Sequence, residues 1–309
     1  MLSVLIPVYN HNVIPLVTAL LKQLRKSAVS FEIIMLDDAS DQQYRFKNAK
    51  LDFEPEVTYL QNLFNVGRAK VRNVLASKAH YPYILFMDCD ATVAQNDYIA
   101  KYLEEIDKHK DMPLVVINGG VLYRAKKPQN NRYLRWYYGT HREQKPAAER
   151  NEHPYDSFTP FNVVLSTEIF SRFEFDENFV TYGNEDTVFG YQLKQANIPC
   201  IHIDNGLYHD GLDTNAQYMK KVESAIDNII NFTGTDHPAV GDMKERVRLL
   251  QVYARCKKFQ LSPLLAKMYS CMGERLKRKI VNAPSLFKLD LYKLLYLSAK
   301  LSPTKAVKK

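Results

Sequence analysis

The chain is poor in cysteine and glycine and has no long apolar run. Cys89, Cys200, Cys256 and Cys271 form no close pair, which argues against a disulfide framework or a zinc ribbon and favours a reducing, cytoplasmic compartment. No apolar stretch approaches the roughly 20 residues that cross a bilayer. The first residues also lack the basic segment of a signal peptide, so we expect neither export nor a membrane-spanning helix.

Glycine is missing where two common nucleotide-binding loops need it. The first apolar stretch runs into Pro7-Val8-Tyr9-Asn10-His11-Asn12, which contains no glycine. This excludes both the G-x-G-x-x-G loop of dinucleotide-binding folds and the G-x-x-x-x-G-K-[ST] P-loop. A sugar nucleotidyltransferase also needs a glycine-rich basic loop at that point. Any phosphate groups must therefore be held by another chemistry, such as a metal ion on carboxylates.

The net charge of +8 lies entirely at one end of the chain. Residues 273–309 contain ten Lys or Arg against Glu274 and Asp290, whereas residues 1–272 are neutral overall. Leucines alternate with those basic residues, so a helix there can lie on an anionic membrane surface. A solvated last helix packed on the core is the alternative. No aromatic-basic pattern accompanies the charge, so we expect no nucleic-acid partner.

Apolar strands alternate with amphipathic helices over the first two hundred residues. Strands are predicted at 2–8, 31–36, 57–60, 83–87 and 114–117, and helices at 16–28, 66–77, 98–108 and 185–195. The alternation predicts an α/β fold with a mostly parallel central sheet flanked by helices. Right-handed crossovers bring the strand ends that carry Asn10, Asp38 and Asp90 to one edge, where such sheets bind ligands.

A helical region follows this α/β part. Helices are predicted at 216–231, 242–257 and 263–279. We therefore expect one domain over residues 1–213 and a C-terminal helical region with a basic tail over residues 214–309.

Two carboxylates directly follow the buried strand 83–87. Asp88 and Asp90 are spaced i, i+2, so in extended backbone their side chains leave on one face while Cys89 points the other way. Two such groups repel each other unless a cation lies between them. The pattern predicts a metal or ligand site, and an ordinary strand-to-loop turn is the alternative.

A second pair of acids opens the predicted helix 185–195. Asn184 can cap this helix, and the helix dipole favours Glu185 and Asp186 in its first turn. Capping does not explain why the pair follows Tyr182-Gly183, a flexible entry suited to approaching a ligand. The spacing alone does not rank Glu185 and Asp186 as bases.

Several segments occur in the order of a known family. Residues 2–10 (LSVLIPVYN), 32–40 (EIIMLDDAS), 65–73 (NVGRAKVRN) and 84–90 (ILFMDCD) together resemble the family 2 glycosyltransferases of the GT-A fold, over roughly residues 1–213. Residues 175–186 resemble the Gly…Glu-Asp acceptor-side motif of these enzymes and of related galactosyl- and N-acetylgalactosaminyltransferases. Residues 208–211 (YHDG) resemble the segment whose histidine completes the metal site in a subset of them.

The resemblance implies a nucleotide-sugar donor, with a UDP-sugar expected. It implies that Asp38 accepts a hydrogen bond from uracil N3–H, while Pro7, Tyr9 and Asn10 line the nucleotide pocket. A turn carboxylate or helix cap is the competing interpretation of Asp38.

The diphosphate side has its own candidates. Arg68 and Arg72 share a helix face at i, i+4 and can meet the diphosphate or bridge to Asp88, although an exposed basic face is the alternative for Arg68. The resemblance places Asp88 near the ribose and the metal, and it implies that Asp90 binds Mn²⁺ or Mg²⁺ together with the diphosphate. His209 is the further expected ligand, with a structural histidine as the alternative.

The implied activity is inverting transfer of a sugar to a glycan or lipid-linked glycan in cell-surface polysaccharide or glycolipid synthesis. Asp186 is the implied general base and Glu185 the contact to the acceptor hydroxyl. The basic tail would hold such an enzyme peripherally on the inner face of the membrane. Two other interpretations stay open: a non-catalytic nucleotide-sugar or glycan-binding module on the same fold, and a sugar nucleotidyltransferase.

Overall fold

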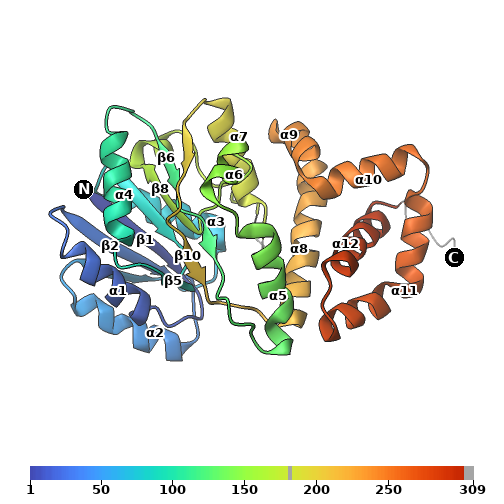
Figure 1. The fold of residues 1–309 in the computed structure, drawn as a ribbon, viewed down its shortest axis with the longest axis horizontal. Helices are drawn as coiled ribbons and strands as arrows, with labels where there is room; N and C mark the ends of the chain where they lie inside the picture. The colour runs from blue at the N-terminus through green and yellow to red at the C-terminus, as the bar shows by residue number, and fades with distance from the viewer. Residues whose placement is uncertain (180–182, 303–309) are drawn as a thin grey trace. The chain divides into compact units, whose positions relative to one another are not determined.

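The computed structural model describes residues 1–179 and 183–302, which form two compact units (Figure 1). The described residues of the first unit are 1–125, 142–179 and 185–211, and those of the second are 126–141, 183–184 and 212–302. The boundary expected after residue 213 divides the sequence once, whereas the second unit also includes residues 126–141. Thr181 and Tyr182 of the acceptor-side motif, and Lys305, Lys308 and Lys309 of the basic tail, lie outside the described residues.

The first unit contains, within the described chain, a seven-stranded sheet in the order β3-β2-β1-β4-β8-β6-β9. Its strands are β1 (Leu2–Val8), β2 (Phe31–Asp37), β3 (Val57–Gln61), β4 (Tyr83–Met87), β6 (Val116–Asn118), β8 (Asn162–Ser166) and β9 (Cys200–His202). β8 pairs antiparallel with β4 and β6, and the other pairs are parallel. The predicted α/β fold with a mostly parallel sheet is confirmed, although β8 was not foreseen.

A small second sheet has the order β5-β10-β7. It comprises β5 (Ala91–Val93), β7 (Val121–Leu122) and β10 (Leu207–His209). β5 begins one residue after Asp90, and its antiparallel pairing with β10 sets His209 opposite Ala91. This pairing joins two segments that are far apart in the sequence.

Helices flank the large sheet on both faces. They are α1 (Ile14–Leu24), α2 (Gln42–Asn48), α3 (Arg68–Ser77), α4 (Tyr98–Lys108), α6 (Ala147–Glu152) and α7 (Glu185–Gln195), with short helical turns η1 (Ala49–Phe53) and η4 (Thr167–Ser171). The predicted bounds of α4 and α7 are confirmed, whereas α1 ends earlier than the predicted Ala28.

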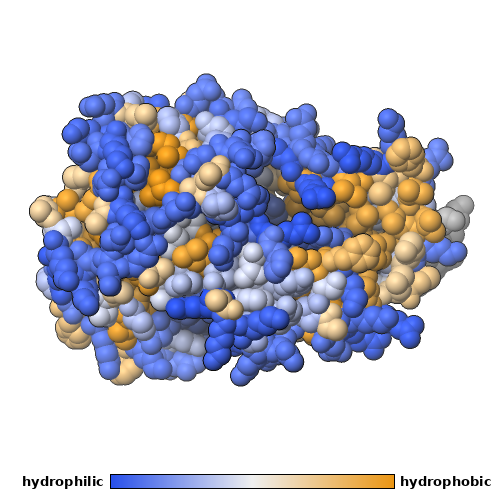
Figure 2. All heavy atoms as spheres, in the orientation of Figure 1, coloured by the Kyte–Doolittle hydropathy of each residue, from blue (hydrophilic) through white to orange (hydrophobic). Residues whose placement is uncertain are grey.

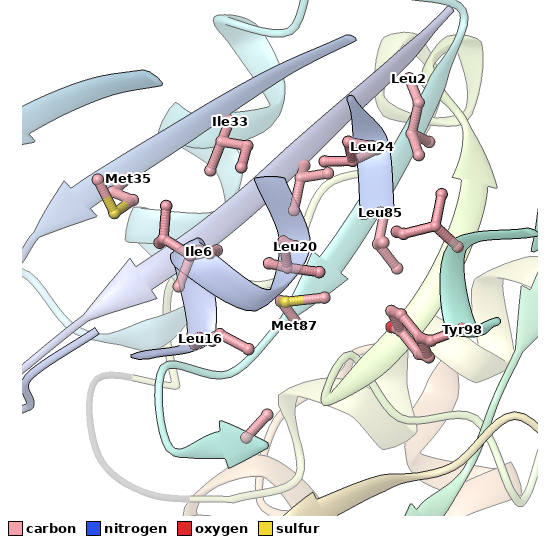
Figure 3. Close-up of a cluster of buried hydrophobic side chains, with 14 of the residues drawn as sticks. Leu2, Ile6, Leu16, Leu20, Leu24, Ile33, Met35, Leu85, Met87 and Tyr98 are labelled. Atoms are coloured by element: carbon pink, nitrogen blue, oxygen red, sulfur yellow. The ribbon is translucent and has the colours of Figure 1, made fainter. Parts of the chain in front are cut away.

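The core forms because strand side chains alternate between the two faces of the sheet. Val4 and Ile6 of β1 belong to a cluster with α1 and α4, whereas Leu5 belongs to a cluster with α3 and α7. Figure 3 shows the first cluster, in which Leu20 of α1 lies over the strands. Because both faces are covered, the strands read as nearly continuous apolar runs.

The order of the central strands brings three polar strand ends together. β1 lies between β2 and β4 and runs parallel to both, so Asn10, Asp38 and Asp88 follow their strands at the same edge of the sheet. The Asp38 backbone N–H donates to the Val8 carbonyl at 2.8 Å, which ties two of these strand ends together. The chain passes from β1 to β2 on one side and from β4 toward β6 on the other, and open α/β sheets bind ligands at such a point.

The second unit is helical. Its elements are η2 (Asn130–Arg132), α5 (Tyr133–Tyr138), η3 (Gly139–Glu143, which begins in this unit), α8 (Asn215–Thr233), α9 (Ala239–Arg246), α10 (Arg248–Lys258), α11 (Ser262–Asn282) and α12 (Leu286–Leu301). The single helix predicted at 242–257 is wrong, because Val247 has an extended ψ of 105° and separates α9 from α10. Thr214 and Gln217 form a reciprocal capping box at the start of α8.

Several leucines of the basic tail belong to the interior of this unit. Leu289, Leu295 and Leu297 of α12 are buried. Lys277 pairs with Glu223 at 2.6 Å and Lys300 pairs with Asp227 at 3.1 Å, and both acids lie on α8. These three leucines thus agree with the alternative of a helix packed on α8 and α11, and membrane binding by the tail stays a prediction. No helix among the described residues is long and apolar enough to cross a bilayer.

The core predicts the effect of a single truncation. Leu20→Ala removes a side chain that is 0% exposed, so we expect the free energy of unfolding to fall by about 2–5 kcal/mol. Leu63→Ala, at a position that is 82% exposed, is the matched control and should change it by less than about 0.5 kcal/mol. Chemical denaturation measures both values, and equal losses would contradict the assigned packing.

Candidate functional site

The paired carboxylates after β4 lie on backbone fixed from several directions. The Asp88 N–H donates to the Phe161 carbonyl at 3.2 Å, and the Asp210 N–H donates to the Asp90 carbonyl at 3.1 Å. The side chain of Asp88 is 13% exposed and that of Asp90 is 21% exposed. Both groups are thus accessible to a small ligand while their backbone is held by neighbouring strands.

His209 lies beside Asp90 because β5 and β10 pair. Its Nε2 is 3.8 Å from Asp90 Oδ2. The imidazole stacks on the Tyr123 ring, with centroids 5.7 Å apart, and on the Phe161 ring at 5.4 Å, and both stacks are nearly parallel. These contacts fix the plane of the imidazole before any ligand arrives.

Gly211 passes close over Asp90. A Cβ atom at this position would lie 2.1 Å from Asp90 Oδ2, so any other residue would displace the carboxylate or the chain. Sequence reasoning assigned no role to Gly211, Tyr123 or Phe161. The glycine was part of the resembling YHDG segment, but its contact depends on the β5–β10 pairing, which local sequence does not reveal.

Arg72 is the central cation of the site. Its side chain is 2% exposed; Nη2 donates to Asp88 Oδ1 at 2.8 Å and Nη1 donates to Glu185 Oε1 at 3.1 Å. Arg68, one helical turn earlier, is 44% exposed and lies 3.4 Å from Asp88 Oδ2. The sequence predicted that Arg72 contacts the diphosphate or bridges to Asp88, and the structure contains the bridge to Asp88.

These cations control the ionisation of Asp88. Burial by itself would raise the pKa of Asp88, but the charges of Arg72 and Arg68 and the hydrogen bond from Arg72 outweigh it and lower the pKa below its ordinary value. Asp88 therefore stays a carboxylate near neutral pH.

The acids that open α7 have different surroundings. Glu185 is buried and bonded to Arg72, whereas Asp186 is half-buried and its Oδ1 accepts the Thr187 N–H at 2.8 Å. Burial and then the charge of Glu185 raise the pKa of Asp186 to about 7, against the opposing effects of the Thr187 N–H and the two arginines. A carboxyl group whose pKa is raised toward neutral pH is typical of a general acid or base.

Asp38 connects the end of β2 to the start of α3. Its Oδ1 accepts hydrogen bonds from Asn62 Nδ2 at 3.0 Å and the Val66 N–H at 2.9 Å, and its Oδ2 accepts the Gly67 N–H at 3.0 Å. Gly67 has a φ of +88°, which glycine adopts without strain. Asp38 thus positions the helix that carries Arg68 and Arg72.

The remaining predicted nucleotide residues lie at the end of β1. Pro7 is half-buried in the strand, and the Tyr9 side chain is 55% exposed. Tyr9 directly follows β1, so it lies at the same edge of the sheet as the carboxylates that follow β4. Asn10 has a φ of +49°, and its Oδ1 accepts the Asp41 N–H at 2.7 Å. Asn10 therefore holds the loop after β2 in place through this hydrogen bond.

The protein side chains alone do not form a complete metal cage. Within residues 1–179 and 183–302, no group of three or more His, Cys, Asp or Glu side chains lies close enough together to hold a metal ion. Magnesium-type sites commonly take one or two carboxylates and draw other ligands from substrate phosphates and water. Asp90 and His209 are the pair that can supply such a partial set.

The buried arginine predicts a large and selective loss of stability. Arg72→Met leaves Asp88 and Glu185 without their shared cation, so we expect the free energy of unfolding to fall by about 3–5 kcal/mol. Arg68→Met removes a half-exposed partner of the same carboxylate and should cost less than about 1 kcal/mol. Similar denaturation midpoints for the two variants would contradict the central place of Arg72.

The geometry can now be compared with known proteins. The model of the family described as Glycosyl transferase family 2 matches residues 3–170, more than half of the chain. Among curated proteins, the chain is 25% identical over 239 residues to a chondroitin synthase from Pasteurella multocida (strain Pm70). The match covers 67% of this chain and 24% of that protein, so the chain spans about a quarter of its relative's length.

Two solved structures share the architecture. A mannosyltransferase from Pyrobaculum calidifontis, in complex with GDP-Man and Mn²⁺, has a TM-score of 0.60 at 14% identity, over 97% of this chain and 86% of that one. Residues 1–349 of S. aureus TarS, in complex with UDP, give a TM-score of 0.51 at 16% identity, over 97% and 91% of the two chains. The predicted GT-A fold is confirmed by these likenesses, and the family match shows that the chain belongs to glycosyl transferase family 2.

Proposed function

We propose that the protein is an inverting glycosyltransferase that moves a sugar from a nucleotide-diphosphate donor to a hydroxyl of a glycan or lipid-linked glycan. The observation that carries the proposal is the Arg72 bridge, which holds the donor-side carboxylate Asp88 and the acceptor-side Glu185 in one buried network. Membership of the family supports glycosyl transfer, and the similarity to a chondroitin synthase supports a role in cell-surface polysaccharide or glycolipid synthesis.

The proposed donor is a UDP-sugar, with Asp38 reading the base. Asp38 Oδ2 accepts the Gly67 N–H and keeps a second lone pair for uracil N3–H. Pro7, Tyr9 and Asn10 would line the nucleotide pocket from the end of β1. The two similar structures carry UDP in one case and GDP-Man in the other, so the fold alone does not choose the base.

The residues around Asp90 fit a divalent cation. Asp90 Oδ1 is buried and accepts no hydrogen bond from the described part of the chain. An imidazole nitrogen beside a carboxylate suits Mn²⁺ better than Mg²⁺. Asp90 and His209 would hold the ion, with Asp88 next to them and the diphosphate and water as further ligands. When bound, the ion stabilises the charge that develops on the leaving diphosphate.

The proposed chemistry is a single displacement. Asp186 takes the proton of the acceptor hydroxyl, whose oxygen attacks the anomeric carbon as the bond to the diphosphate oxygen breaks on the opposite side. Glu185, held in place by its hydrogen bond from Arg72, accepts a hydrogen bond from the acceptor and orients it. The half-exposed Arg68 would contact the diphosphate. The raised pKa of Asp186 favours it over Glu185 as the base.

Two alternatives make different predictions. A non-catalytic binding module is disfavoured because Asp38, Asp88, Asp90 and Asp186 are all present, and such a module would not release nucleoside diphosphate. For a sugar nucleotidyltransferase, this chain lacks the glycine-rich loop, and such an enzyme would release pyrophosphate from a nucleoside triphosphate.

We also propose a cytoplasmic location at the inner face of the membrane. The four unpaired cysteines favour the reducing conditions of the cytoplasm.

Slow donor hydrolysis tests the proposed function. Incubation of the protein with a panel of nucleotide sugars and Mn²⁺ should release UDP from a UDP-sugar, and chelation of the metal should stop the release.

A single substitution tests the metal assignment. Asp90→Asn should abolish Mn²⁺-dependent UDP binding in calorimetry. It should leave the melting curve roughly unchanged, because asparagine has the shape of aspartate and the Asp90 side chain is 21% exposed. Unchanged binding would contradict the metal assignment, and tighter binding of GDP would contradict the role of Asp38.

The proposed base predicts a pH profile. Asp186 acts only when deprotonated, so kcat/KM should rise about tenfold per pH unit below a pKa of about 7 and level off above it. Asp186→Asn should lower turnover by roughly 10²–10⁴-fold while the donor affinity is preserved. If Glu185→Gln is the inactive variant and Asp186→Asn is active, the two roles are reversed.

A further inference from the structure

The turn between α10 and α11 exposes apolar side chains that the helical unit does not bury. Phe259 is 71% exposed, Leu264 is 55% exposed and Leu261 is 44% exposed. Gln260 has a φ of +57° and turns the chain sharply between the two helices, so these three side chains lie at one corner. Figure 2 shows apolar side chains gathering over α10 to α12. Clustered exposed apolar residues of this kind commonly mark interaction sites.

The same corner carries uncompensated positive charge. Between Arg248 and Gly273 the sequence contains five basic residues and no acidic residue. All five are exposed, and within the described chain none of them forms an ion pair; they are Arg248, Arg255, Lys257, Lys258 and Lys267. Lys277 and Lys300, farther along the chain, differ because each of them pairs with an acid of α8. The exposed basic side chains around Phe259 and Leu264 are therefore not balanced by any acidic residue of the same segment.

The combination selects one class of partner. Two copies of this corner would repel each other, because both carry positive charge. A nucleic-acid backbone would not bury the exposed Phe and Leu side chains. An anionic bilayer offers phosphates for the lysines and an apolar interior for the rings and leucines. Charge complementarity and exposed apolar area therefore favour a membrane surface.

We propose that the α10–α11 corner docks on an anionic lipid surface, with Phe259, Leu261 and Leu264 inserted at the headgroup boundary and the flanking basic side chains on lipid phosphates. This surface differs from the tail leucines Leu289, Leu295 and Leu297, which are buried. The proposal goes beyond the proposed transfer reaction and does not depend on it, because all of its residues lie in the helical unit.

Vesicle sedimentation with the full-length protein tests the docking. We expect binding to phosphatidylcholine vesicles that contain phosphatidylglycerol, and little binding to phosphatidylcholine alone. Raising the salt to about 1 M shortens the Debye length to about 3 Å and should release most of the protein. Failure to bind the anionic vesicles at low salt would overturn the proposal, and so would equal binding to the neutral vesicles.

Point variants locate the contact without disturbing the core. Phe259→Ser with Leu264→Ser, and separately Lys257→Glu with Lys258→Glu, should each weaken vesicle partitioning about tenfold or more. Phe53→Ser is the matched control, because Phe53 is 89% exposed but lies in the first unit, and it should bind like the unchanged protein.

Each variant should keep the melting curve and the rate of donor hydrolysis of the unchanged protein, so a failed docking test remains distinct from a failed assignment of function. Equal partitioning of the corner variants would overturn the proposal. Self-association that only the corner variants abolish would also overturn it, in favour of an interface between copies of the chain.

Discussion

The site depends on one buried guanidinium group. Arg72 bonds Asp88 at the end of β4 and Glu185 at the start of α7, two residues that would repel each other without it. Replacing a cation in such a network leaves an uncompensated buried charge, which is among the costliest defects in a folded protein. The carboxyl groups around the bridge also differ in ionisation, because the pKa of Asp88 is lowered by the arginines whereas the pKa of Asp186 is raised by burial.

The position of Arg72 is itself set by the carboxylate that follows β2. Asp38 accepts the N–H groups of Val66 and Gly67, which fixes the first turn of α3 and therefore the direction of its arginines. The small β5–β10 ladder does the same for the other flank, where it sets His209 beside Asp90. The proposed base, metal and acceptor subsites thus share one backbone framework at the edge of the central sheet.

The sequence predicted those features that depend on the residues of one short segment. Buried strands and strongly amphipathic helices such as α4 show their period in the residues themselves, so their bounds could be predicted. The antiparallel strand β8 and the β5–β10 ladder depend on partners far along the chain, and no local pattern specifies them. The same holds for the link from Arg72 to Glu185, 113 residues apart. The tail leucines left two interpretations open, because a helix packed on other helices and one on a membrane have similar patterns.

The central claim is that the donor and acceptor sides of this network act in one displacement at the anomeric carbon. The most direct test is proton NMR of the sugar first released from an α-linked UDP-sugar, with water as the acceptor, before the anomers equilibrate. The anomeric coupling constant identifies the product. The account predicts that the β anomer appears first. Initial release of the α anomer would show retention, and a single displacement with Asp186 as base would then be excluded.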